Sequence, residues 1–379
     1  FIQVHPTAIA GPDKLRLISE SLRGEGARVW VPKRKGDTRD PLTIPAAERW
    51  YFLEEKYPKF KNLVPRDIGA REIFKAVRHD GLGVGGKDQV YLDIVDPDRE
   101  VSQGRGPDEI AHRVEGVVEI YQKFAGEDPR KTPMLVFPAV HYSMGGLWVD
   151  YDQMTNVPGL FAVGEVDYQY HGANRLGANS LISCIYGGMV TGPKMVAYAH
   201  SDAYASSGAA PSTVYEREQR RLQAEYDAIA QKEGDENPYQ IWWELGQLMN
   251  SYVTVERHNK ELEMVDETIQ KMMERWKRCS VLDSGKHANQ ALMFTRQLWN
   301  MLLLARVITV GALLRDESRG SHFKPEFPKR DDEKFLKTTI ARYDAAANHG
   351  PKISYEDVDI SLVKPVLRDY SGKKTEQRA

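Results

Sequence analysis

Cysteine is almost absent from this sequence, with only Cys184 and Cys279 among 379 residues. The two are far apart and form no CxxC pair, which excludes a four-cysteine iron–sulfur cluster carried by this chain. We expect both thiols to be reduced and buried, as in proteins of a reducing compartment. A strong net charge is also lacking, because 52 basic and 54 acidic side chains leave a formal charge of −2. This balance argues against a general nucleic-acid-binding protein, which needs a basic surface.

An uninterrupted apolar run of membrane-spanning length is missing as well. The most apolar stretch, 298–314, contains Asn300, Arg306 and Thr309. Such interruptions are typical of a buried helix in a bundle. No signal peptide is recognisable, and the sequence begins at Phe1 inside a strand-like run, so we expect the numbering to start within a longer protein.

A genuine pyrophosphate-binding glycine loop is also absent. Residues 81–86 match the pattern GxGxxG literally. That pattern binds a dinucleotide only where a strand precedes it and a helix follows it. Here a charged helical segment precedes it and the strand-like run 89–94 follows. We therefore expect a loop that leads into a strand.

What is present up to about residue 200 is a mixture of strand-like and helical segments. We expect short strands at 1–4, 28–31, 89–94, 147–150 and 160–163. Helices are expected at 46–55, 67–77, 107–124 and 180–199. Asp67 is the expected N-cap of its helix.

Beyond residue 200 the sequence is mainly helical, after a linker rich in small residues at 201–211. Apolar residues at three- and four-residue spacing predict helices at 216–231, 241–252, 257–278 and 288–314. The tryptophans of these helices are expected in the core: Trp242, Trp243, Trp276 and Trp299. We expect a further helix at 332–343 and disorder at 371–379.

The most distinctive stretch is His171–Leu181, in which small and polar residues separate two apolar segments. A strand-like run closed by Gly164 and followed by Glu165 precedes it, and a helix is expected to begin near Ser180. A strand, an acid and a helix N-terminus together can hold a ribose and a charged group. Arg175 can bind a carboxylate through two parallel hydrogen bonds. The alternative is a glycine-rich turn with a surface arginine.

Several motifs resemble those of one enzyme family. In chain order they are His5-Pro6-Thr7, Arg23-Gly24-Glu25-Gly26, Pro65-Arg66-Asp67, the run 141–146, Gly164-Glu165, the run 171–181 and the run 315–320. Their types and order resemble the flavoprotein subunit of succinate dehydrogenase and fumarate reductase. Together they are far more specific than any one of them alone.

The resemblance implies an α+β / α/β multidomain protein. It implies a capping domain at 1–138 and the C-terminal segment of a Rossmann-like FAD-binding domain at 139–200. A helical domain at 212–325 and a C-terminal tail region at 326–379 would follow. The rest of the FAD-binding domain, with the histidine to which the flavin is covalently attached, is then expected upstream of Phe1.

The resemblance also implies a dicarboxylate substrate, succinate or fumarate, held at both ends. His141 and Arg175 would bind one carboxylate, and His5 and Ser19 the other. The family usually has threonine where this sequence has Ser19, so the hydroxyl is retained and the methyl group is lost. Without the resemblance, each histidine would read as an ordinary structural residue.

For proton transfer, the resemblance implies Arg66 as the acid in fumarate reduction and the base in succinate oxidation. Glu20 and Arg23 would relay protons to it, and their spacing of three residues places them on one face of a helical turn. First principles would instead favour a histidine, because a guanidinium normally stays protonated. Those principles would assign Arg66 to an ion pair at a helix start.

For the cofactor, Glu165 would bind the ribose hydroxyls of FAD. Asn179, Ser180 and Leu181 would lie at the start of the helix whose N-terminus faces the flavin ring. No metal site is expected. A charged cluster follows near the C-terminus, made of Arg315, Asp316, Glu317, Arg319, His322 and Lys324. We expect it either near the flavin or a domain interface, or as a solvated charged loop.

The partners implied are an iron–sulfur subunit and, through it, a membrane-anchor subunit of the cytochrome b type. The protein would then lie peripherally on the cytoplasmic side of the bacterial inner membrane. Two alternatives stay open. L-aspartate oxidase is a soluble FAD enzyme with similar motifs, and an isolated fragment without enzymatic activity could serve as an interaction module.

Overall fold

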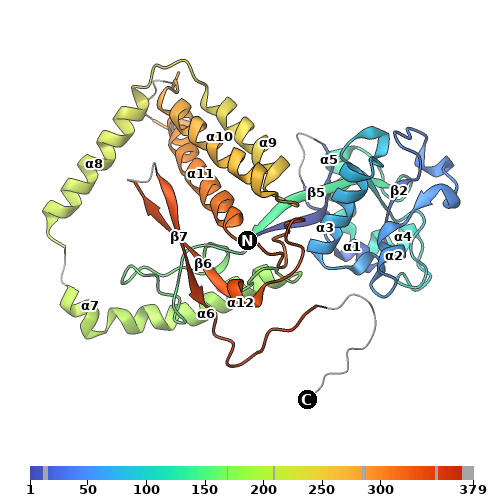
Figure 1. The fold of residues 1–379 in the computed structure, drawn as a ribbon, viewed down its shortest axis with the longest axis horizontal. Coiled ribbons are helices and arrows are strands. Elements are labelled where there is room, and N and C mark those ends of the chain that lie inside the picture. Colours follow the sequence, from blue (N-terminus) through green and yellow to red (C-terminus); the bar gives the residue numbers. More distant parts are fainter. Residues whose placement is uncertain are drawn as a thin grey trace. The chain divides into compact units, whose positions relative to one another are not determined.

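The computed structural model describes residues 1–11, 16–168, 170–207, 210–283, 285, 287–345 and 349–368. The chain divides into two compact units. Unit 1 contains Phe1, Met144–Ala173 and Ser180–Asp359, and unit 2 contains Ile2–Ser143, Asn174–Asn179 and Ile360–Ala379. Figure 1 shows the elements of both units, coloured along the sequence. The mixture of helices and sheet confirms the multidomain α+β class.

Unit 2 is built on one antiparallel sheet. Its strands are β1 (Ile2–Ile9), β2 (Arg28–Pro32), β3 (Arg49–Trp50), β4 (Val90–Asp93) and β5 (Met134–Ser143). They lie in the order β1-β5-β4-β2-β3. The register pairs His5 on β1 with Ala139 on β5. Strand β1 therefore lies beside the strand that carries His141.

The helices of unit 2 are short. They are α1 (Ser21–Gly24), α2 (Phe52–Lys56), α3 (Arg66–Phe74), α4 (Pro107–Arg113) and α5 (Glu115–Ala125). Helix α3 continues as one π-helical turn, Lys75–His79. It packs against β1 and buries Ile68 and Ile73 in the main core of the unit.

Three expectations for unit 2 need correction. The expected helix at 46–55 is a 3-10 turn (Ala46–Glu48) followed by β3 and α2. The expected helix at 107–124 is broken at Val114, whose φ of −127° and ψ of 39° are not helical. Pro65, not Asp67, is the N-cap, because α3 begins at Arg66. The loop expected at 81–86 is confirmed, since a 3-10 turn there leads into β4.

Unit 1 is mainly helical. Its longer helices are α6 (Asn179–Ala199, of which Asn179 itself belongs to unit 2), α7 (Asp202–Ser207), α8 (Ser212–Ala230), α9 (Pro238–Tyr252), α10 (Asn259–Lys277) and α11 (Gln290–Leu313). Helix α12 (Asp332–Phe335) precedes an antiparallel pair of strands, β6 (Lys337–Asp344) and β7 (Gly350–Asp357). Helices α9, α10 and α11 share one apolar core, which Leu298 and Leu302 enter with no exposed surface.

The expected helices at 180–199, 216–231, 241–252, 257–278 and 288–314 are confirmed to within a few residues at each end. The expected helix at 332–343 is wrong after Phe335, where β6 begins. The linker at 201–211 contains α7. The strands expected at 147–150 and 160–163 form only isolated bridges.

Two expectations about burial are also wrong. Trp242 and Trp243 are about half exposed, whereas Trp276 and Trp299 pack against the helical core. Cys184 is exposed on α6, whereas Cys279 is buried, and both thiols are free. Burial raises the pKa of Cys279 to about 11.

The stretch 298–314 falls almost wholly within α11 and is a buried bundle helix, as expected. Among the described helices, none combines the length and the hydropathy that a membrane span requires. Nor do the described histidines, cysteines and acids form a group that could hold a metal ion. The tail expected to be disordered, 371–379, lies outside the described residues.

Candidate functional site

Unit 2 alone contains every residue that the sequence assigns to substrate binding and proton transfer. Strand β1 carries His5, and β5 carries His141. Ser19 and Glu20 precede α1, which carries Arg23, and Arg66 is the first residue of α3. Arg175 comes from the segment Asn174–Asn179, which belongs to unit 2 although its neighbours in sequence belong to unit 1.

Buried positive charge is the main physical feature of this group. Arg23, Arg66 and Arg175 keep 2%, 8% and 2% of their surface exposed. Burying a guanidinium is costly unless an anion or good hydrogen bonds compensate for its lost hydration. Arg66 donates a hydrogen bond to Glu20, and Arg23 lies 4.0 Å from the same carboxylate. The arrangement therefore favours an anionic ligand.

Arg66 is held at two of its nitrogens. Its Nε donates to Oε2 of Glu20 at 2.9 Å, and its Nη1 donates to Oε1 of Gln3 at 3.0 Å. Partial burial tends to raise the pKa of Glu20, but the hydrogen bond and charge of Arg66, with the charges of Arg23 and Arg175, lower it overall. Glu20 is therefore an ionised hydrogen-bond acceptor for Arg66.

Gln3 is a site residue that the motifs did not reveal. Its Nε2 donates to the carbonyl oxygen of Arg175 at 2.6 Å and to Oδ1 of Asn174 at 3.2 Å. Because its Oε1 accepts from Arg66, Gln3 connects the two proposed active arginines through one buried amide. A signal was available: Gln3 is a polar residue two positions before His5 on the same strand, so the alternation of a strand suggests one shared face.

The two histidines lie edge to face, with ring centroids 5.5 Å apart. His5 has no exposed surface. Its Nδ1 lies 3.2 Å from both the amide nitrogen and the carbonyl oxygen of Thr7, and its Nε2 has no partner among the described residues. Burial above all, with the charges of Arg66, Arg23 and His141, lowers the pKa of His5 to about 2. His5 is therefore neutral, and Nε2 is positioned to bond a ligand.

Arg23 is held by backbone oxygens. Its Nη1 donates to the carbonyl oxygen of Asn62 at 2.6 Å and to that of Val64 at 3.5 Å. Its Nη2 lies 4.0 Å from Oε2 of Glu20, so the three-residue spacing does bring these two groups together. Burial, partly offset by Glu20, lowers the pKa of Arg23 to about 10.

The remaining substrate residues are less fully fixed by their contacts. The Oγ of Ser19 accepts from the amide of Ser21 at 3.2 Å and from the hydroxyl of Ser21 at 2.9 Å. The guanidinium of Arg175 lies over the ring of Tyr142, 4.5 Å from its centroid, and donates to the carbonyl oxygen of Leu176 at 3.1 Å. Arg175 is thus buried and not part of a surface turn, which excludes the alternative open for this stretch.

The expected flavin contacts Glu165, Ser180 and Leu181 belong to unit 1, and Asn179 to unit 2. Glu165 is an exposed acid in the 3-10 turn Gly164–Val166. Gly164 has a φ of 78°, and a Cβ there would lie 2.8 Å from Sγ of Cys184 on α6. Only glycine therefore allows this turn to lie so close to the helix.

Helix α6 exposes a row of apolar side chains near its start: Leu181, Ile182, Ile185, Tyr186 and Met189. Its first turn also presents backbone N–H groups that no earlier turn of the helix can satisfy. An acid for ribose hydroxyls, a helix N-terminus and an apolar face fit the chemistry of FAD.

The charged cluster near the C-terminus is not a solvated loop. Glu317 has no exposed surface and accepts from Arg315 and Arg319. Lys324, also fully buried, donates to Oδ1 of Asp316 at 2.8 Å. These charges neutralise one another inside unit 1, which overturns the solvated alternative.

Two family models and several known proteins match this chain. Residues 1–181 match the family model described as FAD binding domain, and residues 243–370 match the one described as fumarate reductase flavoprotein C-term. The chain is 52% identical over 374 residues to the succinate dehydrogenase flavoprotein subunit of Bacillus subtilis, covering 99% of this chain and 60% of that protein. It is 30% identical to the fumarate reductase flavoprotein subunit of Haemophilus influenzae, covering 100% and 60%.

Among solved structures, a quinol fumarate reductase of Escherichia coli superposes with a TM-score of 0.82 at 29% identity. The match covers 98% of this chain and 61% of that one. The chain thus spans about 60% of the length of the curated relatives that it matches.

Proposed function

Because the chain belongs to the family of succinate dehydrogenase and fumarate reductase flavoprotein subunits, whose cofactor is FAD, we propose that it forms the catalytic part of an enzyme interconverting succinate and fumarate. Two buried cations, Arg66 and Arg175, carry this proposal together with the neutral His5. The two positive charges suit a small dianion. On this view residues 1–138 act as the capping domain, and Arg315–Lys324 remain a structural cluster.

Substrate binding requires one grip for each carboxylate. Arg175 offers a planar fork of donors, and His141 adds a single donor for the same carboxylate. Nε2 of His5 and the hydroxyl of Ser19 take the other carboxylate. Holding both ends fixes the two central carbons, which orients the C–H bonds that must break.

Proton transfer falls to Arg66. Its Nε–H already points at the carboxylate of Glu20, so a proton given to Glu20 can be replaced by one taken from the substrate carbon. The bond from Nη1 to Gln3 keeps the guanidinium from rotating during this exchange. Bound FAD, held by Glu165, Asn179, Ser180 and Leu181, would supply the hydride acceptor.

Electrons must leave through a partner, because the two cysteines of this sequence cannot hold an iron–sulfur cluster. We infer an iron–sulfur subunit as that partner and a cytochrome b-type membrane anchor beyond it. The protein would then be peripheral, on the cytoplasmic side of the bacterial inner membrane.

A whole-protein assay tests this function. The full-length protein, expressed with its iron–sulfur partner, is expected to reduce an artificial electron acceptor with succinate and to contain covalently bound FAD. Flavin that stays with the denatured polypeptide is the measurement for attachment. Oxidation of L-aspartate by oxygen, without succinate turnover, would assign the protein to the alternative, L-aspartate oxidase. A preparation with neither activity would leave only the interaction module.

Replacing Gly177 by alanine is expected to reduce succinate turnover strongly although it removes no functional group. A Cβ at this position would lie 1.6 Å from Oε1 of Glu20, so the carboxylate must move away from Arg66. We expect turnover to fall by ~10- to 100-fold, within the range that one displaced proton-transfer group costs. Steady-state kinetics of the assembled enzyme measures it. The matched control is Gly116→Ala, where a Cβ meets nothing within 4 Å and turnover should be normal.

A further inference from the structure

Residues 62–66 include Arg66 and the two backbone carbonyl oxygens that accept from Arg23. Side chains elsewhere in unit 2 fix the position of these residues. The carbonyl oxygens that accept from Arg23 belong to Asn62 and Val64, and Arg66 follows two residues later. We propose that Glu54 and Asn62 are positioning residues, which fix this segment and so hold Arg23 beside Glu20. The inference rests on the proposed function and assigns two further residues to the same site.

Asn62 is the inner anchor. It retains 2% exposure, and both ends of its side-chain amide are bonded. Its Nδ2 donates to Oε1 of Glu54 at 2.8 Å, and its Oδ1 accepts from the amide of Val29 on β2 at 2.9 Å. With its own carbonyl oxygen bound to Arg23, Asn62 links the sheet, α2 and Arg23.

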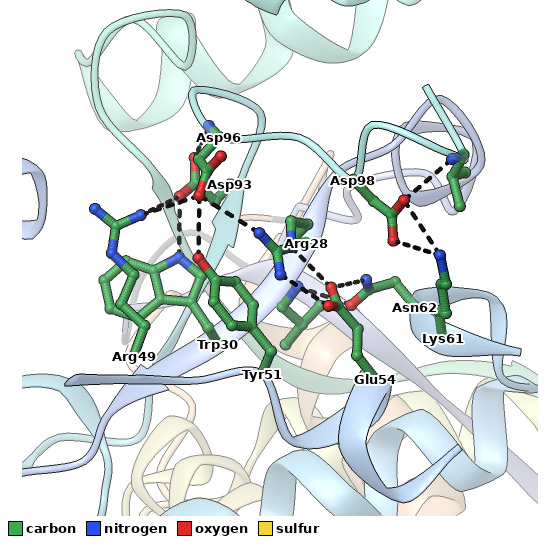
Figure 2. A network of polar contacts seen from close by, with 12 residues as sticks. Arg28, Trp30, Arg49, Tyr51, Glu54, Lys61, Asn62, Asp93, Asp96 and Asp98 are labelled. Carbon is green, nitrogen blue, oxygen red and sulfur yellow. Dashed lines mark hydrogen bonds and ion pairs between the residues drawn. The ribbon is translucent and has the colours of Figure 1, made fainter. Parts of the chain in front are cut away.

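Glu54 is the outer anchor and the centre of the network. Arg28 donates to both of its oxygens, from Nε and Nη2 at 2.8 Å each. The guanidinium of Arg28 lies over the ring of Tyr51, 3.5 Å from its centroid, and also contacts Asp96. Figure 2 shows Glu54 between Arg28 and Asn62. A bidentate pair of this kind fixes direction as well as distance.

The other side of the segment is fixed as well. Lys61 has a φ of 46°, a left-handed conformation that is unfavourable for a lysine. Its Nζ contacts Asp98 at 3.2 Å and Glu100. A strained residue persists only where its surroundings hold it, so the turn Lys61–Leu63 is held from two directions.

The position of Arg23 matters because Arg23 and Glu20 attract each other by charge but share no hydrogen bond. Their closest atoms are 4.0 Å apart, beyond hydrogen-bond length, so the interaction depends on where Arg23 is kept. Arg66 on α3, Arg23 on α1 and Arg175 are the cations that act on Glu20 and lower its pKa against the effect of burial. Loosening Arg23 therefore raises the pKa of Glu20.

The rate of succinate oxidation depends on pH through the charge of Glu20. Glu20 must be ionised to accept a proton from Arg66, so activity falls as the pH drops through the pKa of Glu20. Glu54→Gln removes the charge that binds Arg28 and weakens the hold on Asn62. We expect the acidic midpoint of turnover against pH to rise by about one unit, the lower end of the roughly 1–3 units by which an opposite charge at 4–6 Å shifts a pKa. The Michaelis constant for succinate should change less than about twofold.

The test uses the assembled, FAD-containing enzyme, with turnover expressed per bound flavin from about pH 3 to pH 8, because the pKa of Glu20 lies below its ordinary value. The matched control is Glu55→Gln, which alters the next residue of α2, an exposed acid that accepts from Nε1 of Trp50 at 2.9 Å. Its pH profile should coincide with that of the wild type. A purely structural role of Glu54 would lower the melting temperature without moving the midpoint.

An unmoved midpoint in Glu54→Gln overturns the inference and leaves the proposed function intact, provided the wild type oxidises succinate. A wild type that does not oxidise succinate overturns both. If Glu54→Gln does not assemble, Asn62→Ala carries the same test. It leaves the pair of Glu54 and Arg28 intact and should raise the midpoint, and an unchanged midpoint there contradicts the inference.

Discussion

Replacing Arg66 by lysine is expected to lower succinate turnover ~100- to 10,000-fold, the range that a positioned acid–base group contributes. The reason is geometric, because an ammonium is a single point charge and cannot donate to Glu20 and Gln3 in the fixed fork of a guanidinium. Binding of malonate, a dicarboxylate inhibitor, should change only a few-fold, since the positive charge is kept. Stopped-flow and steady-state turnover with malonate titration measure both quantities.

The control for this variant is Arg71→Lys, on the same helix. Arg71 pairs with Asp67 at 2.8 Å and is assigned to neither the substrate nor the proton. Its turnover should stay within about threefold of the wild type, as expected for a partly exposed ion pair. Near-normal turnover of Arg66→Lys would show that another group transfers the proton, and His141 would then be the next candidate.

Arg175→Gln is expected to abolish tight dicarboxylate binding. Removing one partner of a buried, hydrogen-bonded charge pair costs at least ~2 kcal/mol, which raises the dissociation constant of malonate roughly thirtyfold or more. The side chain keeps 2% exposure, so water cannot replace the lost fork. Isothermal titration of the oxidised enzyme with malonate measures the change.

The control for Arg175→Gln is Arg130→Gln, which removes the surface ion pair of Arg130 with Asp128. Arg130 lies 2.9 Å from Asp128 and is exposed, so Arg130→Gln should leave malonate binding unchanged. The bound FAD of both variants should match the wild type. Malonate binding by Arg175→Gln within about threefold of normal would contradict the substrate role of Arg175.

Sequence motifs indicated candidate site residues, but they did not indicate the contacts that hold those residues in place. His5, Arg66 and Arg175 stand in motifs, and the structure places them in one unit. Gln3 and Asn62 escaped notice for different physical reasons. Gln3 acts through partners up to 172 residues away, and the contact of Asn62 with Arg23 uses a backbone carbonyl, which every residue possesses.

Two wrong expectations, the helix over residues 337–343 and the solvated charged cluster, show what a local sequence pattern does not reveal. Residues 337–344 contain adjacent threonines, an isoleucine and a tyrosine, which favour a strand, and pairing with β7 fixes that state. In the cluster around Glu317, the composition shows charges but not their pairing. Mutual neutralisation is what allows Arg315 and Lys324 to be buried.

The membership of Asn174–Asn179 in unit 2 has a consequence for folding kinetics. Strands β1 and β5 can pair as soon as Ser143 has been synthesised, but the bond from Gln3 to Arg175 needs 32 further residues. Because Gln3 is then already paired with Tyr142, the loop that remains to be closed spans about 33 residues, which costs about 3 kcal/mol of chain entropy. At 5–20 residues per second, a ribosome needs at least roughly two seconds to add the 32 residues from Ser143 to Arg175. The nascent chain can therefore carry a finished sheet before the bond between Gln3 and Arg175 forms.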